Sequence, residues 1–396
     1  MKRSEFLKLS GLVSGSLLVP GFLQAFTEKQ RLFQGKRIVF VQLSGGNDGL
    51  NTLVPFRNDI YYKLRPKLAL PSDKLLKIND EAGFHPAMEG FRRLFDEGQL
   101  SIFNGVGYPN PDRSHFRSTD IWHTASASDE YLNTGWLGRL LDAECKGSEN
   151  PWYALEVDDT LSLALKGARK SGFAMKDAGR LKSLMQDPMF EHLAERRMDA
   201  QANSEQAFLY KTLRETRSAA AYLVEKSAAK PSSRMYPQHD LGNALRQIAS
   251  LISAGMESGI YYTGLSGFDT HVRQAETQQR LLNILSDSIA AFAEDLKAAG
   301  EWQNTVVVVF SEFGRRVKQN ASNGTDHGTA NNVYVLGGGL KNPGMRNPLV
   351  SLSDLDDNDL RHTIDFRELY ASLLDQAFEF DHQKILGRKF NTWPLV

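Results

Sequence analysis

The sequence has 396 residues, of which 41% are hydrophobic and 24% are charged, as in an ordinary globular protein with room for one large domain or two smaller ones. Lys plus Arg and Asp plus Glu are equal at 47 each, so the overall charge does not favour binding to nucleic acid or to an anionic membrane surface. The single cysteine, Cys145, excludes a disulfide framework or a cysteine-based metal site within one chain.

The chain begins with the features of an export signal. A basic head that includes Arg3 precedes an apolar stretch from Leu9 to Phe26, which is broken by glycine and proline. Because this stretch is too short and too broken for a transmembrane helix, we predict a signal peptide over residues 1–26 and a periplasmic or extracellular mature protein without a transmembrane span. The head resembles a twin-arginine signal, with Ser4 in place of the second arginine. The twin-arginine and general export routes both stay open.

The first predicted strand covers Lys36–Leu43 and is expected to be buried on both faces. It leads into Ser44-Gly-Gly-Asn-Asp48-Gly, which puts Asp48 at the carboxyl end of the strand, where open α/β sheets bind their ligands. The glycines allow the backbone to approach a ligand closely. A tight turn without a ligand is the alternative interpretation of Asn-Asp-Gly. A second strand is predicted at Leu100–Asn104.

A helix is predicted over roughly residues 116–125, after a loop rich in Gly, Pro, Asn and Asp. Ser114 lies at the start of this helix, in the positive end of the helix dipole, which favours an alkoxide or a bound anion. In the alternative interpretation Ser114 is only an N-cap. Arg117 is a candidate for holding an anionic substrate, or else an ordinary ion-pair partner.

The stretch from about 150 to 256 is rich in Ala, Gln, Arg, Glu and Lys, and we predict that it forms a helical insertion in a single domain over residues 27–396. A short strand at Gly259–Thr263 follows and leads to Asp269-Thr-His271, a spacing that lets both side chains face one ion. A long helix over residues 273–299 has apolar residues along one face and connects to the next strand. This arrangement is a βαβ unit and predicts parallel strands.

The strand Val306–Phe310 is a β-branched run that ends at Ser311-Glu312, so Glu312 also follows a buried strand. A Gly- and Asn-rich loop then carries Asp326 and His327 side by side, before the chain re-enters the sheet. A polar loop with an Asp-containing turn is the alternative interpretation. Arg315 is a second candidate for binding an anionic substrate, with an ordinary ion pair as its alternative.

Together the strand ends supply carboxylates and imidazoles without thiolates. Several carboxylates at one place repel each other unless a cation lies between them. These donors suit one or two divalent ions, either Zn²⁺ or Mn²⁺ or, where carboxylates dominate, Mg²⁺ or Ca²⁺. Two ions about 3.5–4 Å apart hold both the attacking and the leaving oxygen of a displacement. The candidate metal ligands are Asp48, Asp269, His271, Glu312, Asp326 and His327.

Several motifs in this order resemble the family catalogued as domain of unknown function 1501, over nearly the whole mature chain. They are Ser-Gly-Gly-Asn-Asp-Gly-Leu-Asn, Arg-Ser-His-Phe, Gly-Phe-Asp-Thr-His, Ser-Glu-Phe-Gly-Arg and Asp-His-Gly. That family is similar in fold to the alkaline phosphatase and sulfatase superfamily, which implies a three-layer α/β/α domain with a mostly parallel central sheet.

The resemblance also implies an activity. The expected protein is a metal-dependent hydrolase of phosphate or sulfate esters, acting on a small-molecule or glycan ester. The likeness makes Asp48 the first metal ligand and Ser114 the nucleophile, and it makes Asp269, His271, Glu312 and His327 the further ligands.

Two departures from the superfamily pattern keep a second class of function open. The superfamily spaces its pair as Asp-x-x-x-His, where this chain has Asp269-Thr-His271, and it has Asp-His where this chain has Ser311-Glu312. The alternative is a non-catalytic exported protein that retains a metal site for stability or for partner binding.

Other hydrolase and nucleotide-binding motifs do not fit. Gly264-Leu-Ser-Gly-Phe268 lacks the final glycine of a nucleophile elbow, and no P-loop or dinucleotide-binding glycine motif occurs. Gly-x-Asn-Asp around Asp48 is also found in some serine esterases, but these need a nucleophilic serine upstream, where only the signal peptide lies.

Overall fold

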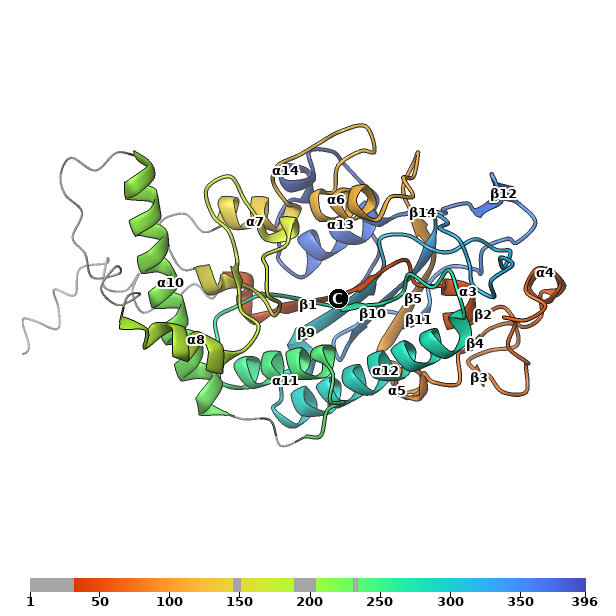
Figure 1. Ribbon diagram of the computed structural model, residues 1–396, viewed down its shortest axis with the longest axis horizontal. Coiled ribbons are helices and arrows are strands. Elements are labelled where there is room, and N and C mark those ends of the chain that lie inside the picture. The colour runs from red at the N-terminus through yellow and green to blue at the C-terminus, as the bar shows by residue number, and fades with distance from the viewer. Residues whose placement is uncertain (1–31, 145–150, 189–203, 231, 233) are drawn as a thin grey trace, which may run out of the picture.

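The computed structural model of the protein describes residues 32–144, 151–188, 204–230, 232 and 234–396. The predicted signal peptide, residues 1–26, lies outside these residues. A nine-stranded sheet forms the middle layer, and helices cover both of its faces (Figure 1). This arrangement confirms the predicted three-layer α/β/α architecture.

The central strands of the sheet run parallel. β1 (Arg37–Ser44) has β8 (Ile260–Ser266) on one side and β9 (Thr305–Phe310) on the other, both parallel to it. β10 (Asn331–Gly337) runs antiparallel to β9 and to β5 (Leu100–Gly107). The sheet order is β11-β5-β10-β9-β1-β8-β6-β7, with β14 beside β5, so the prediction of a mostly parallel sheet is confirmed. The remaining strands of this sheet are β6 (Ala154–Glu156), β7 (Phe173–Ala174), β11 (Gly344–Met345) and β14 (Ile364–Asp365).

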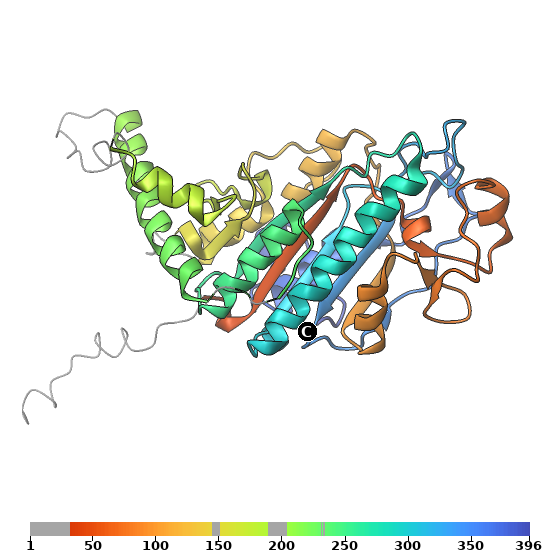
Figure 2. The ribbon, with the colours of Figure 1, turned by 60° about the horizontal axis from the view of Figure 1, so that its bottom comes forward.

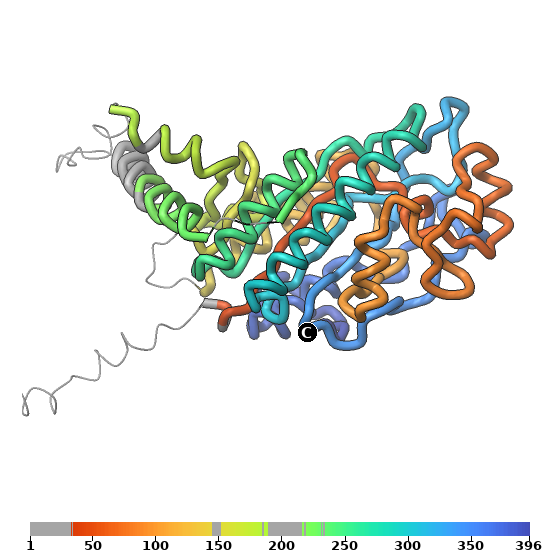
Figure 3. Tube along the Cα trace, turned by 90° about the horizontal axis from the view of Figure 1, so that it is seen from below, coloured from red at the N-terminus to blue at the C-terminus, as the bar shows by residue number. Residues whose placement is uncertain are grey.

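Both faces of β1 are apolar because successive side chains alternate between two hydrophobic cores. Val39 and Val41 pack in a core with α5 (Glu89–Asp96), α11 (Asp240–Ser253) and α12 (Gln274–Ala298). Figures 2 and 3 show α11 and α12 lying side by side across this face. Ile38 and Phe40 face the other core. That core includes α6 (His115–Thr124), α7 (Trp136–Glu144), α13 (Phe366–Gln376) and α14 (His382–Leu386).

The stretch predicted as a helical insertion also extends the sheet. Within residues 150–256, β6 pairs in parallel with β8, and β7 pairs in parallel with β6. These strands have three and two residues, which is too short for an alternating pattern to show in the sequence. Two helices, α8 (Ala178–Met185) and α10 (Ser204–Ala229), lie beyond this edge, at the left of Figure 1.

A smaller lobe follows β1 and has its own apolar core around Leu50, Val54 and Tyr61. Its elements are α3 (Gly49–Thr52), β2 (Leu53–Val54), α4 (Asp59–Leu64), β3 (Leu76–Lys77) and β4 (Gly83–Phe84). Later in the chain, β12 (Leu355–Asp356) and β13 (Asp359–Leu360) form a separate two-stranded sheet. No helix in the described part of the chain combines the length and the apolar character needed to span a membrane.

Candidate metal centre

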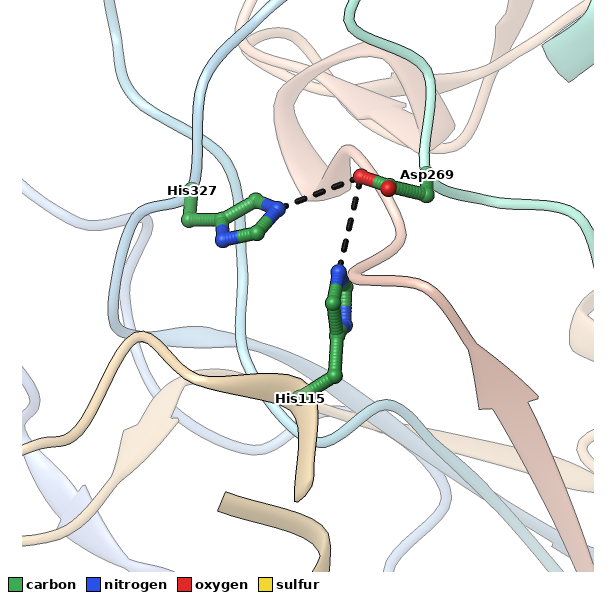
Figure 4. Close-up of side chains that lie close together, drawn as sticks. All are labelled: His115, Asp269 and His327. Atoms are coloured by element: carbon green, nitrogen blue, oxygen red, sulfur yellow. Dashed lines mark hydrogen bonds and ion pairs between the residues drawn. The ribbon is translucent and has the colours of Figure 1, made fainter. Parts of the chain in front are cut away.

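Three side chains that could ligate a metal meet above the carboxyl ends of the central strands. Asp269 follows β8, His327 lies in the loop between β9 and β10, and His115 is the first residue of α6 (Figure 4). One ligand atom from each of these residues lies within 4.8 Å of the others. Parallel strands bring residues far apart in the chain to one edge of the sheet in this way.

A fourth side chain joins this group around one carboxylate oxygen. The Oδ1 atom of Asp269 lies 3.0 Å from Nε2 of His271, 3.1 Å from Nε2 of His327 and 3.5 Å from Nε2 of His115. The Nε2 atoms of His271 and His327 are 2.9 Å apart. We refer to Asp269, His115, His271 and His327 as the His/Asp cluster.

Each histidine of the cluster holds its other ring nitrogen, Nδ1, against an oxygen atom. The Nδ1 atom of His115 lies 2.8 Å from Oε1 of Glu312, and that of His327 lies 2.8 Å from the carbonyl oxygen of Arg113. The Nδ1 atom of His271 lies 3.2 Å from Oδ1 of Asp326. These acceptors assign the proton of a neutral ring to Nδ1, so each Nε2 presents a lone pair to the cluster.

The residues present fit a divalent cation. Nε2 of His115 is buried and has no hydrogen-bond partner among the described residues. With the protons on Nδ1, three lone pairs face one carboxylate oxygen, which is unfavourable without a positive charge between them. A cation would satisfy all four groups, and neutral imidazole with a second partner on its other nitrogen is the usual form of a histidine ligand.

The carboxylate at the centre of the cluster is ionised. Burial alone would raise the pKa of Asp269, but the hydrogen bond donated by Arg315 and the contact with His327 outweigh burial and lower this pKa to about 2. The side chain of Asp269 is 49% exposed, so solvent reaches the centre of the cluster. An ion bound here would be accessible to a small molecule.

Glu312 lies beside the cluster and contacts the ring of His115. Its side chain is only 1% exposed, and its Oε1 atom accepts hydrogen bonds from the backbone nitrogen of Gly45, at 2.8 Å, and from His115. Oε2 lies 3.1 Å from the hydroxyl of Ser311. The sequence predicts Glu312 as a metal ligand, and the structure places its Oε1 atom against the Nδ1 atom of His115.

Asp326 has a similar placement on the other side of the cluster. Its Oδ1 atom accepts from Nδ1 of His271 and, at 3.1 Å, from the side-chain nitrogen of Asn320. Asp326 therefore faces the outer nitrogen of a histidine, although the sequence predicts it as a ligand. Of the six predicted ligands, the structure brings three into the cluster itself, which are Asp269, His271 and His327.

Asp48 does not join the histidines. Its side chain is 1% exposed and forms an ion pair of 2.5 Å with Arg65, which is itself fully buried. It also accepts hydrogen bonds from the backbone nitrogen of Leu50 and from the side chain of Gln274. A buried guanidinium requires a counter-charge, so Asp48 neutralises Arg65 in the structure.

Arg315 and Arg117 both donate to protein oxygens. The guanidinium of Arg315 has no exposed surface, and it donates to Asp269 and to four backbone carbonyl groups. These contacts tie together the loops that follow β1, β8 and β9. Arg117 donates to three carbonyl groups after α6 and lies 3.9 Å above the ring of Tyr131. In the structure both arginines are bonded to protein groups, and the ion pair of Arg315 with Asp269 agrees with the alternative interpretation that the sequence left open. The carbonyl groups bonded by Arg315 are those of Gly45, Gly46, Phe268 and Thr325.

Ser114 immediately precedes His115, as the N-cap of the ten-residue helix α6. Its side chain makes no capping hydrogen bond and is exposed, while its backbone nitrogen donates to Asp112 at 2.6 Å. The hydroxyl therefore has no structural partner of the kind that an N-cap serine normally has.

Comparison with known families identifies the chain. A family model described as "Protein of unknown function (DUF1501)" matches residues 35–393. The chain belongs to the DUF1501 family. This confirms the resemblance found in the sequence. No curated protein sequence matches this DUF1501 protein.

Solved structures overlap this DUF1501 protein only loosely, at 9–12% identity and TM-scores of 0.29–0.39, and one of them is described as a 2-O GAG sulfatase. At these identities and TM-scores they carry no activity over to it. The lipoteichoic acid synthase LtaP from Listeria monocytogenes is 10% identical, with 80% of this chain and 67% of that chain covered and a TM-score of 0.35. The C-terminal periplasmic domain of EcEptC from Escherichia coli is 12% identical, with 77% of this chain and 73% of that chain covered and a TM-score of 0.37. The phosphonate monoester hydrolase SpPMH from Silicibacter pomeroyi is 10% identical, with 90% of this chain and 77% of that chain covered and a TM-score of 0.34.

His115 is not among the ligands predicted from the sequence. Its neighbour Ser114 drew attention because helix starts favour anions, and a single histidine in a helical pattern has no distinguishing feature. The position of His115 within Arg-Ser-His-Phe, one of the motifs shared with DUF1501, was the available signal.

Proposed function

We propose that this DUF1501 protein is a metal-dependent hydrolase of phosphate or sulfate esters that acts after export. The observation that carries the proposal is the convergence of three histidine Nε2 atoms on Oδ1 of Asp269, at distances of 3.0–3.5 Å. Hydrolysis of such esters requires charge stabilisation at the transferred group, and a cation in this cluster would supply it.

The donor set narrows the choice of ion. Three imidazole nitrogens and one carboxylate oxygen suit Zn²⁺, Mn²⁺ or another first-row metal better than Mg²⁺ or Ca²⁺, which prefer oxygen ligands. The three nitrogen atoms surround the single carboxylate oxygen, which suits one ion per chain. When bound, the ion would polarise the ester and lower the pKa of water.

The residues of the chain divide the remaining work. His115, His271 and His327 would hold the ion, with Glu312 and Asp326 keeping two of the rings in place. Ser114, exposed at the start of α6, is the proposed nucleophile, because the helix dipole favours negative charge at its hydroxyl and at a bound anionic group.

One observation favours an enzyme over the non-catalytic alternative. Structural metal sites are enclosed by protein, whereas sites that act on a substrate leave a position open. Asp269 and His271 have 49% and 40% of their side-chain surface exposed, so the cluster is open on one side. The export part of the proposal rests on the layout of residues 1–26 in the sequence.

The proposal is tested with the mature chain, loaded separately with Zn²⁺ and Mn²⁺, on a panel of aryl phosphate monoesters, aryl phosphate diesters and aryl sulfates. We expect turnover of at least one class, and its loss in Ser114→Ala without loss of metal or of folded protein. The matched control is Ser162→Ala, which removes another N-cap serine without a side-chain capping bond. Unchanged turnover in Ser114→Ala would assign the attack to water in place of Ser114. A metal-loaded wild type that hydrolyses none of the panel contradicts the hydrolase proposal and supports the non-catalytic alternative.

A further inference from the structure

A second feature of the same sheet edge is a large polar cavity. Its volume is about 830 Å³, and it lies between the ends of β6 and β8 and the helices α8 and α11. Figure 1 shows α8 and α11 at the lower left of the molecule. Ligand pockets typically have volumes of about 300–1,000 Å³, so this cavity has room for a ligand the size of a disaccharide.

The ends of two strands connect the cavity to the His/Asp cluster along the chain. Ser44 and Ser266, the last residues of β1 and β8, line the cavity. The next residue after Ser44 is Gly45, which donates to Glu312 below the cluster, and Asp269 follows Ser266 by three residues. The two strand ends that line the cavity therefore lead directly into the loops beside the cluster.

The lining of the cavity is dominated by neutral groups that form hydrogen bonds. The lining includes the three amide side chains of Gln238, Asn243 and Gln247. Only four of the lining residues are apolar. A typical pocket for an apolar ligand has mainly hydrophobic walls. Six hydroxyl side chains complete the neutral set, from Ser44, Ser227, Ser232, Ser250, Thr263 and Ser266.

The charges of the lining disfavour a strongly anionic ligand. Three carboxylates, Asp158, Asp177 and Asp240, face two bases, Lys176 and Arg246. Lys176 is already paired with Asp159 at 2.5 Å. The carboxylates would repel a phosphate or sulfate group inside the cavity, but they accept hydrogen bonds from hydroxyl groups.

Three buried polar atoms of the lining residues have no partner among the residues that the structure describes. They are Oγ of Ser227, Nδ1 of His239 and Nε2 of Gln247. Buried polar atoms without partners are rare in proteins and are usually satisfied by water or a ligand. His239 and Gln247 lie at the N-cap and in the second turn of α11, so one helix presents two of the three atoms.

We propose that this cavity binds a neutral saccharide and holds the sugar portion of the ester. The first part of this proposal is independent of catalysis, and the second rests on the proposed function. Hydroxyl, amide and carboxylate side chains pair with the many donors and acceptors of a sugar. The anionic ester group would then lie at the His/Asp cluster, away from the cavity and its repelling carboxylates.

Binding is tested by isothermal titration calorimetry of the metal-free mature protein with maltose, cellobiose, lactose and N,N′-diacetylchitobiose. Neither a metal nor an ester is present, so a failure of the hydrolase proposal leaves the result unaffected. We expect saturable binding of at least one sugar, weakened tenfold or more by Gln247→Leu and by Asn243→Ala. Asn243 is exposed, so its variant tests the site even where Gln247→Leu disturbs folding. Gln383→Leu, on α14 at the opposite face of the sheet, is the control and should bind as the wild type does.

Three outcomes would overturn the proposal. The first is the absence of saturable binding for all four sugars. The second is sugar binding that both cavity variants leave unchanged. The third is a cavity that binds inorganic sulfate in competition with the sugars, because the carboxylates of the lining should exclude that anion.

Discussion

The Nδ1 atom of His115 lies 2.8 Å from the Oε1 atom of Glu312, and the same oxygen accepts a hydrogen bond from the backbone nitrogen of Gly45. The carboxylate thus links the loop after β1, the end of β9 and the start of α6 at one point. By fixing the proton on Nδ1, it directs the Nε2 lone pair of His115 towards Asp269. Glu312 therefore contacts the His/Asp cluster through His115.

The first prediction concerns this carboxylate. Glu312→Gln removes its charge and weakens its hold on Nδ1 of His115, so Zn²⁺ affinity should fall by about 10–100-fold while the fold is retained. Competition with a chromophoric chelator measures this change. Glu156→Gln is the matched control, because Glu156 is also buried in the sheet but bonds to Ser162. Equal Zn²⁺ affinities for wild type and Glu312→Gln would argue against the positioning role.

The second prediction separates the two roles considered for Asp48. Because its carboxylate neutralises the buried Arg65, Asp48→Asn should lower the free energy of unfolding by about 3–5 kcal/mol and leave bound Zn²⁺ unchanged. Urea unfolding and metal analysis of the same samples measure both quantities. The double variant Asp48→Asn, Arg65→Met should recover part of the stability, since no uncompensated charge is left. Loss of Zn²⁺ from a normally stable Asp48→Asn protein would instead support the ligand role expected from the sequence.

The third prediction concerns a buried acid away from the cluster. Burial raises the pKa of Glu156 from 4.5 to about 7, so the folded protein keeps a proton there that the unfolded chain releases above pH 4.5. The stability contributed by this group is complete below pH 4.5 and is lost as the pH rises through 7. Glu156→Gln should therefore be more stable than wild type at pH 8, by up to about 3 kcal/mol, and equal to it near pH 4.5. Urea unfolding at both values measures the difference, and the exposed Glu81→Gln is the control. A Glu156→Gln protein less stable than wild type at pH 8 contradicts the prediction.

Much of the sheet could be predicted from the sequence because its central strands are apolar on both faces and end abruptly at polar residues. Val306–Phe310 and the strand before Asp48 are examples, and the helix between β8 and β9 made parallel pairing predictable. The paired strands β6 and β7 could not be predicted, since two or three residues carry no periodic pattern. Their place in the sheet depends on contact with β8, which is remote in the chain.

The candidate site was predictable only as a set of strand ends. The spacing Asp269-Thr-His271 and the loop carrying His327 led to three residues of the cluster. The sequence could not show that Arg65 would be buried beside Asp48, or that Glu312 would face Nδ1 of His115, because both depend on side chains from distant segments. Carboxylates at neighbouring strand ends look alike in a sequence, and only their partners distinguish a ligand from a group that supports one.

The most direct test of the central claim is the X-ray absorption spectrum of the mature protein loaded with Zn²⁺ and freed of excess metal. We predict one ion per chain with about four nitrogen and oxygen ligands at roughly 2.0–2.1 Å, and the multiple-scattering pattern of three imidazoles. His327→Ala should lose one imidazole from this pattern or lose the ion. A protein that retains no Zn²⁺, or a Zn²⁺ shell without imidazole scattering, would contradict the assignment of His115, Asp269, His271 and His327 as a metal centre.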